Sequence, residues 1–305
     1  MDRPYLLGPA RAAETVYFLG VSTARHRGTA AALAASILAV TALAAEARAK
    51  IVFCAPGAPG TTEEAQPAMD AFAAALAAKA RLPAGELGAT YAASEEAGIA
   101  RLRAADASLA IVSLPFFLKH EKSLALRAEI QPVPQGRAGG ERWSLVARRG
   151  RITAPGSLDG FTILSSAGFS PGFVRGPALG GWGRLPASVR IVQSAAVLSA
   201  LRRAAAGEQV AVLLDGAQEA ALPTLPLASE LEVVARSPVL PVGIVAAVDR
   251  RVAPARWEKV HAALRQLPSD PAGSQALGGI RMSRFEPLDA KALSAARRAY
   301  AEALR

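Results

Sequence analysis

Serines and glycines are grouped at the end of a short apolar stretch in the sequence FTILSSAGFSPG, residues 161–172. Ser165, Ser166 and Ser170 bring three hydroxyls close together, and the glycines among them leave backbone N–H groups accessible. At a turn from a strand into a helix, such donors can bind an anion. The same residue types also form ordinary helix caps and tight turns, so both interpretations stay open at this point.

Other hydroxyl and acidic side chains stand where further predicted strands end. In open α/β sheets, ligands bind beyond the carboxyl ends of the strands, where helix N-termini also lie. The additional candidate ligand-binding residues at these ends are Thr61, Thr62, Ser113, Ser194 and Asp215. The two threonines also fit a helix cap, and the Asp-Gly pair at 215–216 also fits an exposed turn. A structural role therefore stands beside the binding role.

The sequence carries no recognisable metal-binding or phosphate-loop signature. It lacks the H-E-x-x-H and P-loop patterns. The three histidines, His26, His120 and His261, are far apart, and the lone Cys54 lies in the apolar stretch IVFC. Metal sites use ligands at closer and more regular spacing. We therefore predict a binding protein and not an enzyme, with no metal, no cofactor and Cys54 in the core.

Length and composition indicate a globular chain of one large or two smaller domains. The chain has 305 residues, of which 51% are hydrophobic, enough for a substantial core. Its formal net charge of +10 is spread along the sequence, and aromatic residues make up only 5%. Binding of nucleic acid usually requires clustered basic residues interleaved with aromatic ones. We therefore expect no nucleic-acid partner.

The N-terminal 49 residues have the order of a secretory signal. Three basic residues at 25–27 precede the uncharged stretch 28–45, and Ala47-Arg48-Ala49 provides small residues for cleavage before Lys50. The alternative is a membrane anchor, because the uncharged stretch approaches the length that spans a bilayer. Its alanine-rich composition favours cleavage. Residues 1–20 lie upstream of this signal and are interpreted as a product of start-site choice.

From Lys50 onward, short apolar runs alternate with helical patterns, which is typical of parallel βαβ units and an α/β fold. A glycine- and proline-rich loop is predicted over 131–141. Two segments, around 142–149 and 241–250, are predicted to carry the chain across and back between two lobes. Strands are predicted over 50–55, 87–93, 108–115, 142–150, 188–194 and 209–216, with two more in 230–252, and a turn followed by a strand is predicted over 157–166. Helices are predicted over 67–80, 94–106, 195–207, 255–267 and 290–304.

The order of these motifs resembles the phosphonate/phosphate-type periplasmic substrate-binding proteins, the soluble receptors of ABC importers. The matching segments are SLAIVSLPFFL, RWSLVAR, SLDGFTIL, ALRRAAAGEQVAVLLDG and SPVLPVGIVAAV. The resemblance implies a two-lobed type II periplasmic-binding-protein-like fold, in which each lobe is a mainly parallel sheet flanked by helices and two hinge strands join the lobes. It implies one lobe from 50–142 plus 248–305 and another from 143–247.

The resemblance also implies a function and a site. The anion cradle of this family would fall on Ser165, Ser166 and Ser170, its first-lobe aromatic on Phe116 or Phe117, and its acidic residue on Asp215. The expected protein is a periplasmic monomer that binds a small phosphate- or phosphonate-like anion between the lobes. Its partner would be the membrane permease of an ABC importer or a sensor domain. A divergent sensory or interaction module and an enzyme on the same scaffold are the alternatives.

Overall fold

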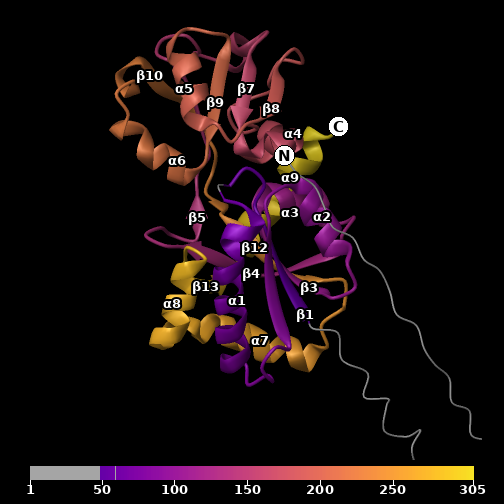
Figure 1. Ribbon diagram of the computed structural model, residues 1–305. Helices are drawn as coiled ribbons and strands as arrows, with labels where there is room; N and C mark the ends of the chain where they lie inside the picture. Colours follow the sequence, from indigo (N-terminus) through magenta and orange to yellow (C-terminus); the bar gives the residue numbers. More distant parts are fainter. Residues whose placement is uncertain (1–48, 59) are drawn as a thin grey trace, which may run out of the picture. The chain divides into compact units, whose positions relative to one another are not determined.

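The computed structural model of this protein describes residues 49–58 and 60–305, so the predicted signal segment lies outside the described residues. The described residues belong to one compact unit that contains a six-stranded sheet and a five-stranded sheet (Figure 1). No helix within the described residues is sufficiently long and apolar to cross a bilayer.

The first sheet combines parallel strands with antiparallel ones in the order β13-β4-β12-β3-β1-β2. The strand β1 pairs in parallel with β2 and β3, whereas β12 is antiparallel to β3 and β4, and β13 is antiparallel to β4. The bounds are β1 Ala49–Cys54, β2 Leu87–Ala92, β3 Ala107–Ser113, β4 Leu126–Pro134, β12 Gly243–Val248 and β13 Met282–Pro287.

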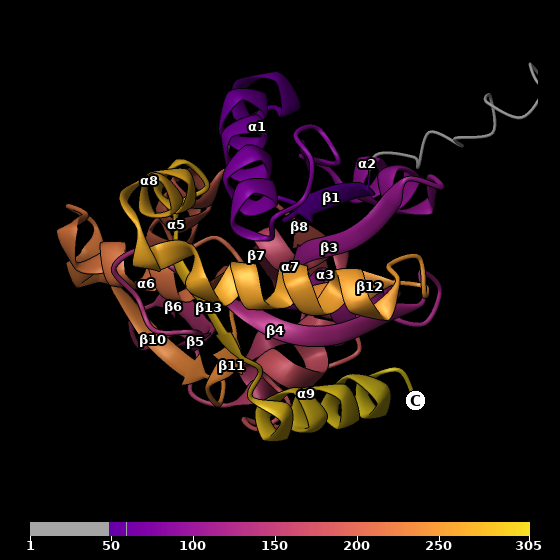
Figure 2. The ribbon, with the colours of Figure 1, turned by 90° about the horizontal axis from the view of Figure 1, so that it is seen from below.

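Both faces of this sheet are buried, which explains the almost continuous apolar runs of its central strands. Successive side chains of a strand point to opposite faces. Accordingly, Ile51 packs in one core cluster while Val52 packs in another. One face is covered by α1 (Thr62–Lys79), α7 (Pro254–Gln266) and α8 (Pro271–Gly279), as Figure 2 shows. On the other face pack α2 (Glu95–Arg103) and α3 (Leu114–His120). Cys54 is buried, as predicted.

The second sheet has the order β10-β6-β9-β7-β8. The strand β7 is parallel to both β8 and β9, and β6 is antiparallel to β9 and β10. The helix α5 (Val197–Ala205) packs on this sheet through Ala200 and Leu201, and α6 (Gly216–Ala221) follows β9. The bounds are β6 Ser144–Arg148, β7 Thr162–Ser165, β8 Arg190–Gln193, β9 Val210–Leu214 and β10 Leu231–Arg236.

The two sheets are connected by a short antiparallel pair, β5 (Gly140–Glu141) with β11 (Leu240–Pro241). The crossing segments therefore lie earlier than the sequence predicts, because β6 and β12 are already members of the two sheets. In particular, the predicted return to the first lobe at residue 248 is the end of β12. That strand pairs with β3 from Gly243 onward, so the chain re-enters the first sheet five residues earlier.

The C-terminal helix α9 (Ala290–Ala303) follows β13 of the first sheet but packs against the second half of the chain (Figure 1). Its contacts there are with α4 (Pro171–Phe173) and the following π-helical turn η3 (Val174–Ala178). Arg297 also forms an ion pair with Glu121 at 2.7 Å, next to α3. The helix thus contacts both halves.

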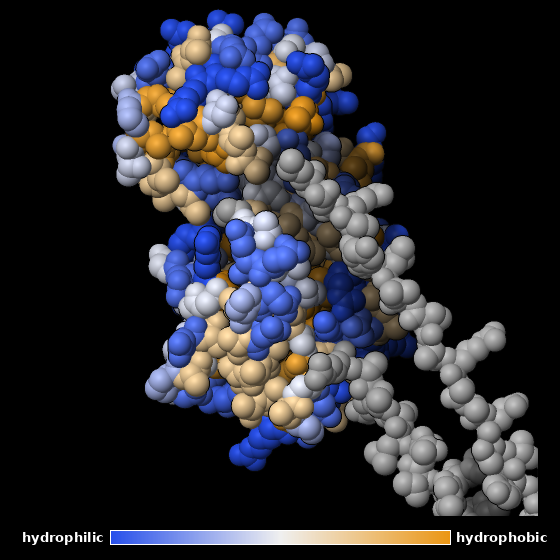
Figure 3. Space-filling view, viewed as in Figure 1, coloured by the Kyte–Doolittle hydropathy of each residue, from blue (hydrophilic) through white to orange (hydrophobic). Residues whose placement is uncertain are grey.

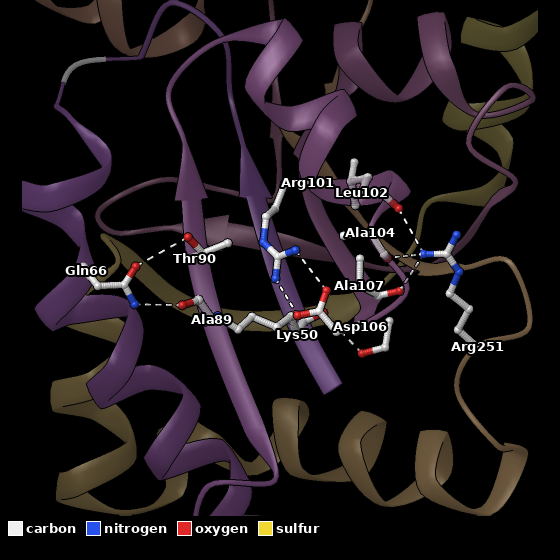
Figure 4. Close-up of polar contacts among 11 residues, drawn as sticks. Lys50, Gln66, Ala89, Thr90, Arg101, Leu102, Ala104, Asp106, Ala107 and Arg251 are labelled. Carbon is white, nitrogen blue, oxygen red and sulfur yellow. Dashed lines mark hydrogen bonds and ion pairs between the residues drawn. The ribbon is translucent and has the colours of Figure 1, made fainter. Parts of the chain in front are cut away.

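Polar contacts hold the amino-terminal end of β3 in place (Figure 4). Arg101 donates two hydrogen bonds to Asp106, of 2.9 and 2.7 Å. The Nη1 atom of Arg251 donates to the carbonyl oxygens of Leu102, Ala104 and Ala107. These bonds satisfy backbone acceptors where α2 ends and β3 begins.

The surface mixes hydrophilic and apolar residues, with an apolar band across the half built on the second sheet (Figure 3). Two of the exposed large hydrophobic side chains, Val192 and Leu198, belong to this half. Single exposed apolar side chains are normal on soluble proteins.

Candidate functional site

A cavity of about 200 Å³ lies where the carboxyl ends of both sheets meet the crossing segments. Open α/β sheets bind ligands at such ends. The first half contributes Ala55, Pro56, Gly57, Ala58, Ser113 and Pro115; the crossing segments contribute Arg137, Glu141, Trp143 and Val242; the second half contributes Ser166, Ala167, Phe169, Asp215 and Gln218. Three of the sequence-predicted residues, Ser113, Ser166 and Asp215, therefore line one cavity.

A larger hollow of about 280 Å³ lies at the ends of β4 and β12, lined by Ala125, Arg127, Ala247, Asp249 and Arg250. It is formed by the first sheet alone and contains none of the sequence-predicted site residues. The smaller cavity is the better candidate, because both halves build it and because two of its lining residues, Ser113 and Trp143, carry buried polar groups without a partner among the described residues.

The three serines of the opening motif occupy different environments. Ser166 lines the cavity and is 9% exposed. Ser165 is buried, and its hydroxyl donates to the carbonyl of Leu213 at 2.8 Å and accepts from the N–H of Ala167. Ser170 is also buried and does not line the cavity; its hydroxyl has no hydrogen-bond partner among the described residues. Only Ser166 is thus placed to contact a ligand directly.

Two of the candidates that lie outside the cavity have structural hydrogen bonds. Thr61 is the N-cap of α1 and forms a capping box, in which its hydroxyl accepts from the N–H of Glu64 and the Glu64 carboxylate accepts from the N–H of Thr61. Thr62 begins the helix. Ser194 accepts a hydrogen bond from the N–H of Ala196 in the turn before α5. The helix-cap interpretation of the threonines fits their geometry better than a binding role.

The predicted contact of Phe116 with the ligand is wrong, because its side chain lies in the core and not at the cavity. Its side chain is fully buried, and its ring lies 4.8 Å from that of His120 in the core. The helix α3 begins directly after β3, and its first turn brings Pro115 to the cavity while Phe116 turns inward. Phe117 is equally buried, beneath Arg297. The aromatic residues that line the cavity are Phe169, from the serine motif itself, and Trp143.

Asp215 lines the cavity and also caps α6. Its Oδ1 accepts from the N–H groups of Ala217 and Gln218 at 2.8 and 2.9 Å, and the Gln218 side chain accepts from the N–H of Asp215. The carboxylate is therefore held in place by the helix that it begins. A ligand would meet a fixed negative charge on this side of the cavity.

Glu141 in β5 is a site residue that the sequence analysis missed. Its carboxylate accepts from Arg137 at 3.3 Å and from the N–H of Gly216 at 3.2 Å, and its side chain is 8% exposed. Burial, followed by the charge of Asp215, raises the pKa of Glu141 to about 7, against the opposing effect of Arg137. The charge of the cavity therefore changes near neutral pH.

Trp143 and Arg137 were also missed, because both lie in or next to the segment predicted as a loop. Trp143 is 5% exposed, and its indole Nε1 has no hydrogen-bond partner in the part of the chain that the structure describes. The hydroxyl of Ser113, another residue that lines the cavity, is likewise buried and unpaired within the described residues. The pairing of β5 with β11 gives no local sequence pattern that would reveal these residues.

The two halves contact one another beside the cavity. Lys119 donates to the carbonyl oxygen of Phe169 at 2.6 Å and forms an ion pair with Glu95 at 2.7 Å. Gly57 adopts a φ of +84°, and a Cβ at this position would lie 3.1 Å from the carbonyl oxygen of Ser166. A glycine thus allows the loop after β1 to approach the serine motif closely.

Comparison with solved structures identifies the fold. No family model and no curated protein sequence matches the chain. XAC2383 from Xanthomonas citri, bound to chloride, has 14% identity and a TM-score of 0.67, over 84% of this chain and 98% of that one. A binding protein component of an ABC phosphonate transporter from Pseudomonas aeruginosa has 15% identity and a TM-score of 0.60, over 84% and 87%.

A third similar structure is PhnD1 from Prochlorococcus marinus in complex with methylphosphonate, with 12% identity and a TM-score of 0.60, over 84% of this chain and 98% of that one. At such identities the similarity concerns the fold. The predicted two-lobed α/β architecture is confirmed: this chain has the type II periplasmic-binding-protein fold.

Proposed function

We propose that this protein is an exported solute-binding protein that holds a small ligand with an oxyanion head group between its lobes. The observation that carries the proposal is the cavity itself, built by both halves at the carboxyl ends of β1, β3, β7 and β9 and supplied with buried donors. Binding proteins of this fold close around their ligands by hinge motion. Binding, and not catalysis, is the activity proposed.

The size and lining of the cavity support a small, oxygen-rich ligand. Its volume of about 200 Å³ lies below the roughly 300–1,000 Å³ of pockets for drug-sized molecules. The side chains of Ser113, Ser166 and Arg137 offer donors to ligand oxygens. Each hydrogen bond to a charged oxygen contributes roughly 1.5–3 kcal/mol. Three or four of them therefore reach the roughly 8 kcal/mol of micromolar binding.

The charges in the cavity limit which anions fit. Arg137 is paired with Glu141, and Asp215 adds a second carboxylate. Glu141 becomes neutral as the pH falls below about 7, and the charged groups left in the cavity are then Arg137 and Asp215. Neutral hydroxyl donors would then carry much of the recognition, as suits a singly charged phosphonate or phosphate.

The proposed partner is the permease of an ABC importer, to which a ligand-bound monomer would be presented in the periplasm after export. Two of the similar structures are phosphonate-binding proteins by their own descriptions, which supports a phosphonate- or phosphate-like ligand here. Loss of transport, with retention of the fold as a sensory module, would appear as a protein that binds ligand without a permease.

A ligand panel tests the proposal on the full chain. Thermal unfolding is followed with phosphate, phosphite, methylphosphonate, sulfate and small carboxylates, and positive ligands are confirmed by calorimetry. A ligand at 100 times its Kd stabilises the folded state by about 2.7 kcal/mol. If no compound at millimolar concentration raises the unfolding temperature, the proposed oxyanion function is wrong.

A matched pair of serine variants connects the binding to the cavity. Ser113→Ala removes the unpaired hydroxyl of a residue that lines the cavity, whereas Ser194→Ala removes one that caps a turn outside it. We expect about 10-fold weaker binding for the first variant and unchanged binding for the second. Equal affinities for both variants would place the ligand elsewhere.

A further inference from the structure

We propose that the indole N–H of Trp143 is a direct hydrogen-bond donor to the ligand and a determinant of specificity. This inference rests on the proposed function and deepens it, since it assigns a ligand contact to the segment between the two sheets. It requires that the ligand present an acceptor oxygen toward this crossing segment.

The backbone of Trp143 is fixed independently of its indole. Its N–H donates to the hydroxyl of Ser237 at 2.9 Å, and its carbonyl accepts from the N–H of Ser237 at 2.8 Å. That hydroxyl in turn donates to the carbonyl of Pro238 at 2.6 Å. The main-chain N–H and C=O groups of Trp143 are thus held by Ser237 of the other crossing segment. The indole nitrogen takes no part in these hydrogen bonds.

The ring of Trp143 is held by apolar packing. It meets the ring of Phe173 edge to face, with centroids 5.1 Å apart and planes at 74°. Phenylalanine could supply most of this contact. Tryptophan adds an N–H group, which can only donate. Buried tryptophans normally find a partner for this group.

Trp143 lines the cavity, and its indole N–H group is buried and lacks an acceptor among the described residues. A buried donor without a partner costs about 1–3 kcal/mol. That cost is recovered when an acceptor enters the cavity. A ligand oxygen at this point would accept a hydrogen bond from the indole N–H. A ligand that places an acceptor there would therefore bind more tightly than one that does not.

A second unpaired group defines where the ligand oxygens would lie. Ser113, at the end of β3 in the first sheet, lines the same cavity, and its hydroxyl too is buried and unpaired within the described residues. Trp143 and Ser113 therefore approach from the crossing segment and from the first lobe. A head group with several acceptor oxygens on one central atom, such as a phosphonate or phosphate, can satisfy both.

Isotope-edited NMR tests the contact on the full chain. The sequence has three tryptophans, so a ¹⁵N-labelled sample gives indole signals from Trp143, Trp182 and Trp257. Each is assigned with its own phenylalanine variant. We expect saturating methylphosphonate or inorganic phosphate to move the Trp143 indole proton downfield. Trp257 is the control, since it lies on α7 beside His261.

A shape-preserving substitution measures the effect on affinity. Benzothienylalanine at position 143 replaces the N–H of the indole by sulfur and retains the fused rings. We expect its Kd for the probe to rise by about 10- to 100-fold, since a hydrogen bond to a charged acceptor is lost. The same replacement at position 257 is the matched control and leaves the Kd unchanged.

The outcomes separate this inference from the proposed function. Binding by the wild type with an unchanged Kd after replacement at position 143 overturns the role of Trp143 and leaves the proposed function intact. An indole signal that is already downfield in the free protein and does not move identifies a structural water as the partner, which also overturns it. Failure of the wild type to bind any probe overturns both.

Discussion

Lys119 of α3 donates a hydrogen bond of 2.6 Å to the carbonyl oxygen of Phe169, at the end of the serine motif in the other half of the chain. Its ammonium lies 5.6 Å from the centre of the Phe169 ring and forms an ion pair with Glu95, which also contacts His120. Phe169 lines the cavity. A single lysine thus connects the first half to a wall of the candidate site.

Removal of this connection is expected to favour an open arrangement of the lobes. Lys119→Met loses both the hydrogen bond to Phe169 and the ion pair with Glu95. We predict a larger radius of gyration for the ligand-free variant in small-angle X-ray scattering, and several-fold weaker ligand binding, since a smaller fraction of molecules is competent to bind. Lys122→Met, at an exposed position just after α3, is the control. Identical scattering from the two variants would show that the contact does not hold the lobes.

The carboxyl of Glu141 is expected to make stability depend on pH. Because burial raises its pKa from the usual 4.5 to about 7, the folded protein retains a proton in this range that the unfolded chain releases. The contribution of the group to the free energy of unfolding is therefore complete below pH 4.5 and is lost as the pH rises to about 7. Glu141→Gln removes this loss, which amounts to at most about 3 kcal/mol.

Urea unfolding between pH 5 and 8 measures the effect of Glu141. The decrease in stability with rising pH should be smaller in Glu141→Gln than in the wild type. Glu258→Gln, at an exposed position, is the control and should follow the wild type. An unchanged slope in Glu141→Gln contradicts a proton held at this site.

The affinity for an anionic ligand should depend on the protonation state of Glu141. Glu141 lines the cavity, so its charge repels an anionic ligand above pH 7 and is absent below it. Methylphosphonate should therefore bind more tightly at pH 6 than at pH 8, and Glu141→Gln should reduce this difference. Calorimetry at the two pH values provides the comparison. Tighter binding of methylphosphonate at pH 8 would contradict this role of Glu141.

The capping role of Thr61 predicts a loss of stability without a loss of binding. Thr61→Ala removes the side-chain acceptor for the N–H of Glu64 and should lower the free energy of unfolding by about 1 kcal/mol. The Kd of a ligand should not change, because Thr61 lies outside the cavity. Thr62→Ala, one residue into the helix, is the control for stability. Weaker ligand binding by Thr61→Ala would instead support the predicted contact between Thr61 and the ligand.

Gly176 allows α9 to pack closely on the second half. A Cβ at this position would overlap the carbonyl oxygen of Ala299. Gly176→Ala should therefore displace the helix and destabilise the fold by about 1–3 kcal/mol. Gly181→Ala, where a Cβ meets nothing within 4 Å, is the matched control. Chemical denaturation compares the two, and equal stabilities would contradict the close packing.

Much of the architecture could be predicted from local patterns. The apolar run of β3 predicts a strand buried on both faces, and Thr61 caps its helix as the sequence indicates. The prediction over 131–141 was wrong in part, because β4 continues to Pro134. Prolines 132 and 134 lack the N–H donor of a strand and therefore looked like loop residues. They are tolerated next to β13, the outermost strand of the sheet.

The sequence by itself determined the α/β alternation, the caps and the group of hydroxyls after β7, because these depend on residues a few positions apart. Only the tertiary structure decided which hydroxyls face the cavity. Ser165 and Ser166 are adjacent, yet the first bonds to β9 and the second reaches the site. Glu141 and Trp143 join that site through pairing with residues about 100 positions later, and no local pattern encodes such a contact.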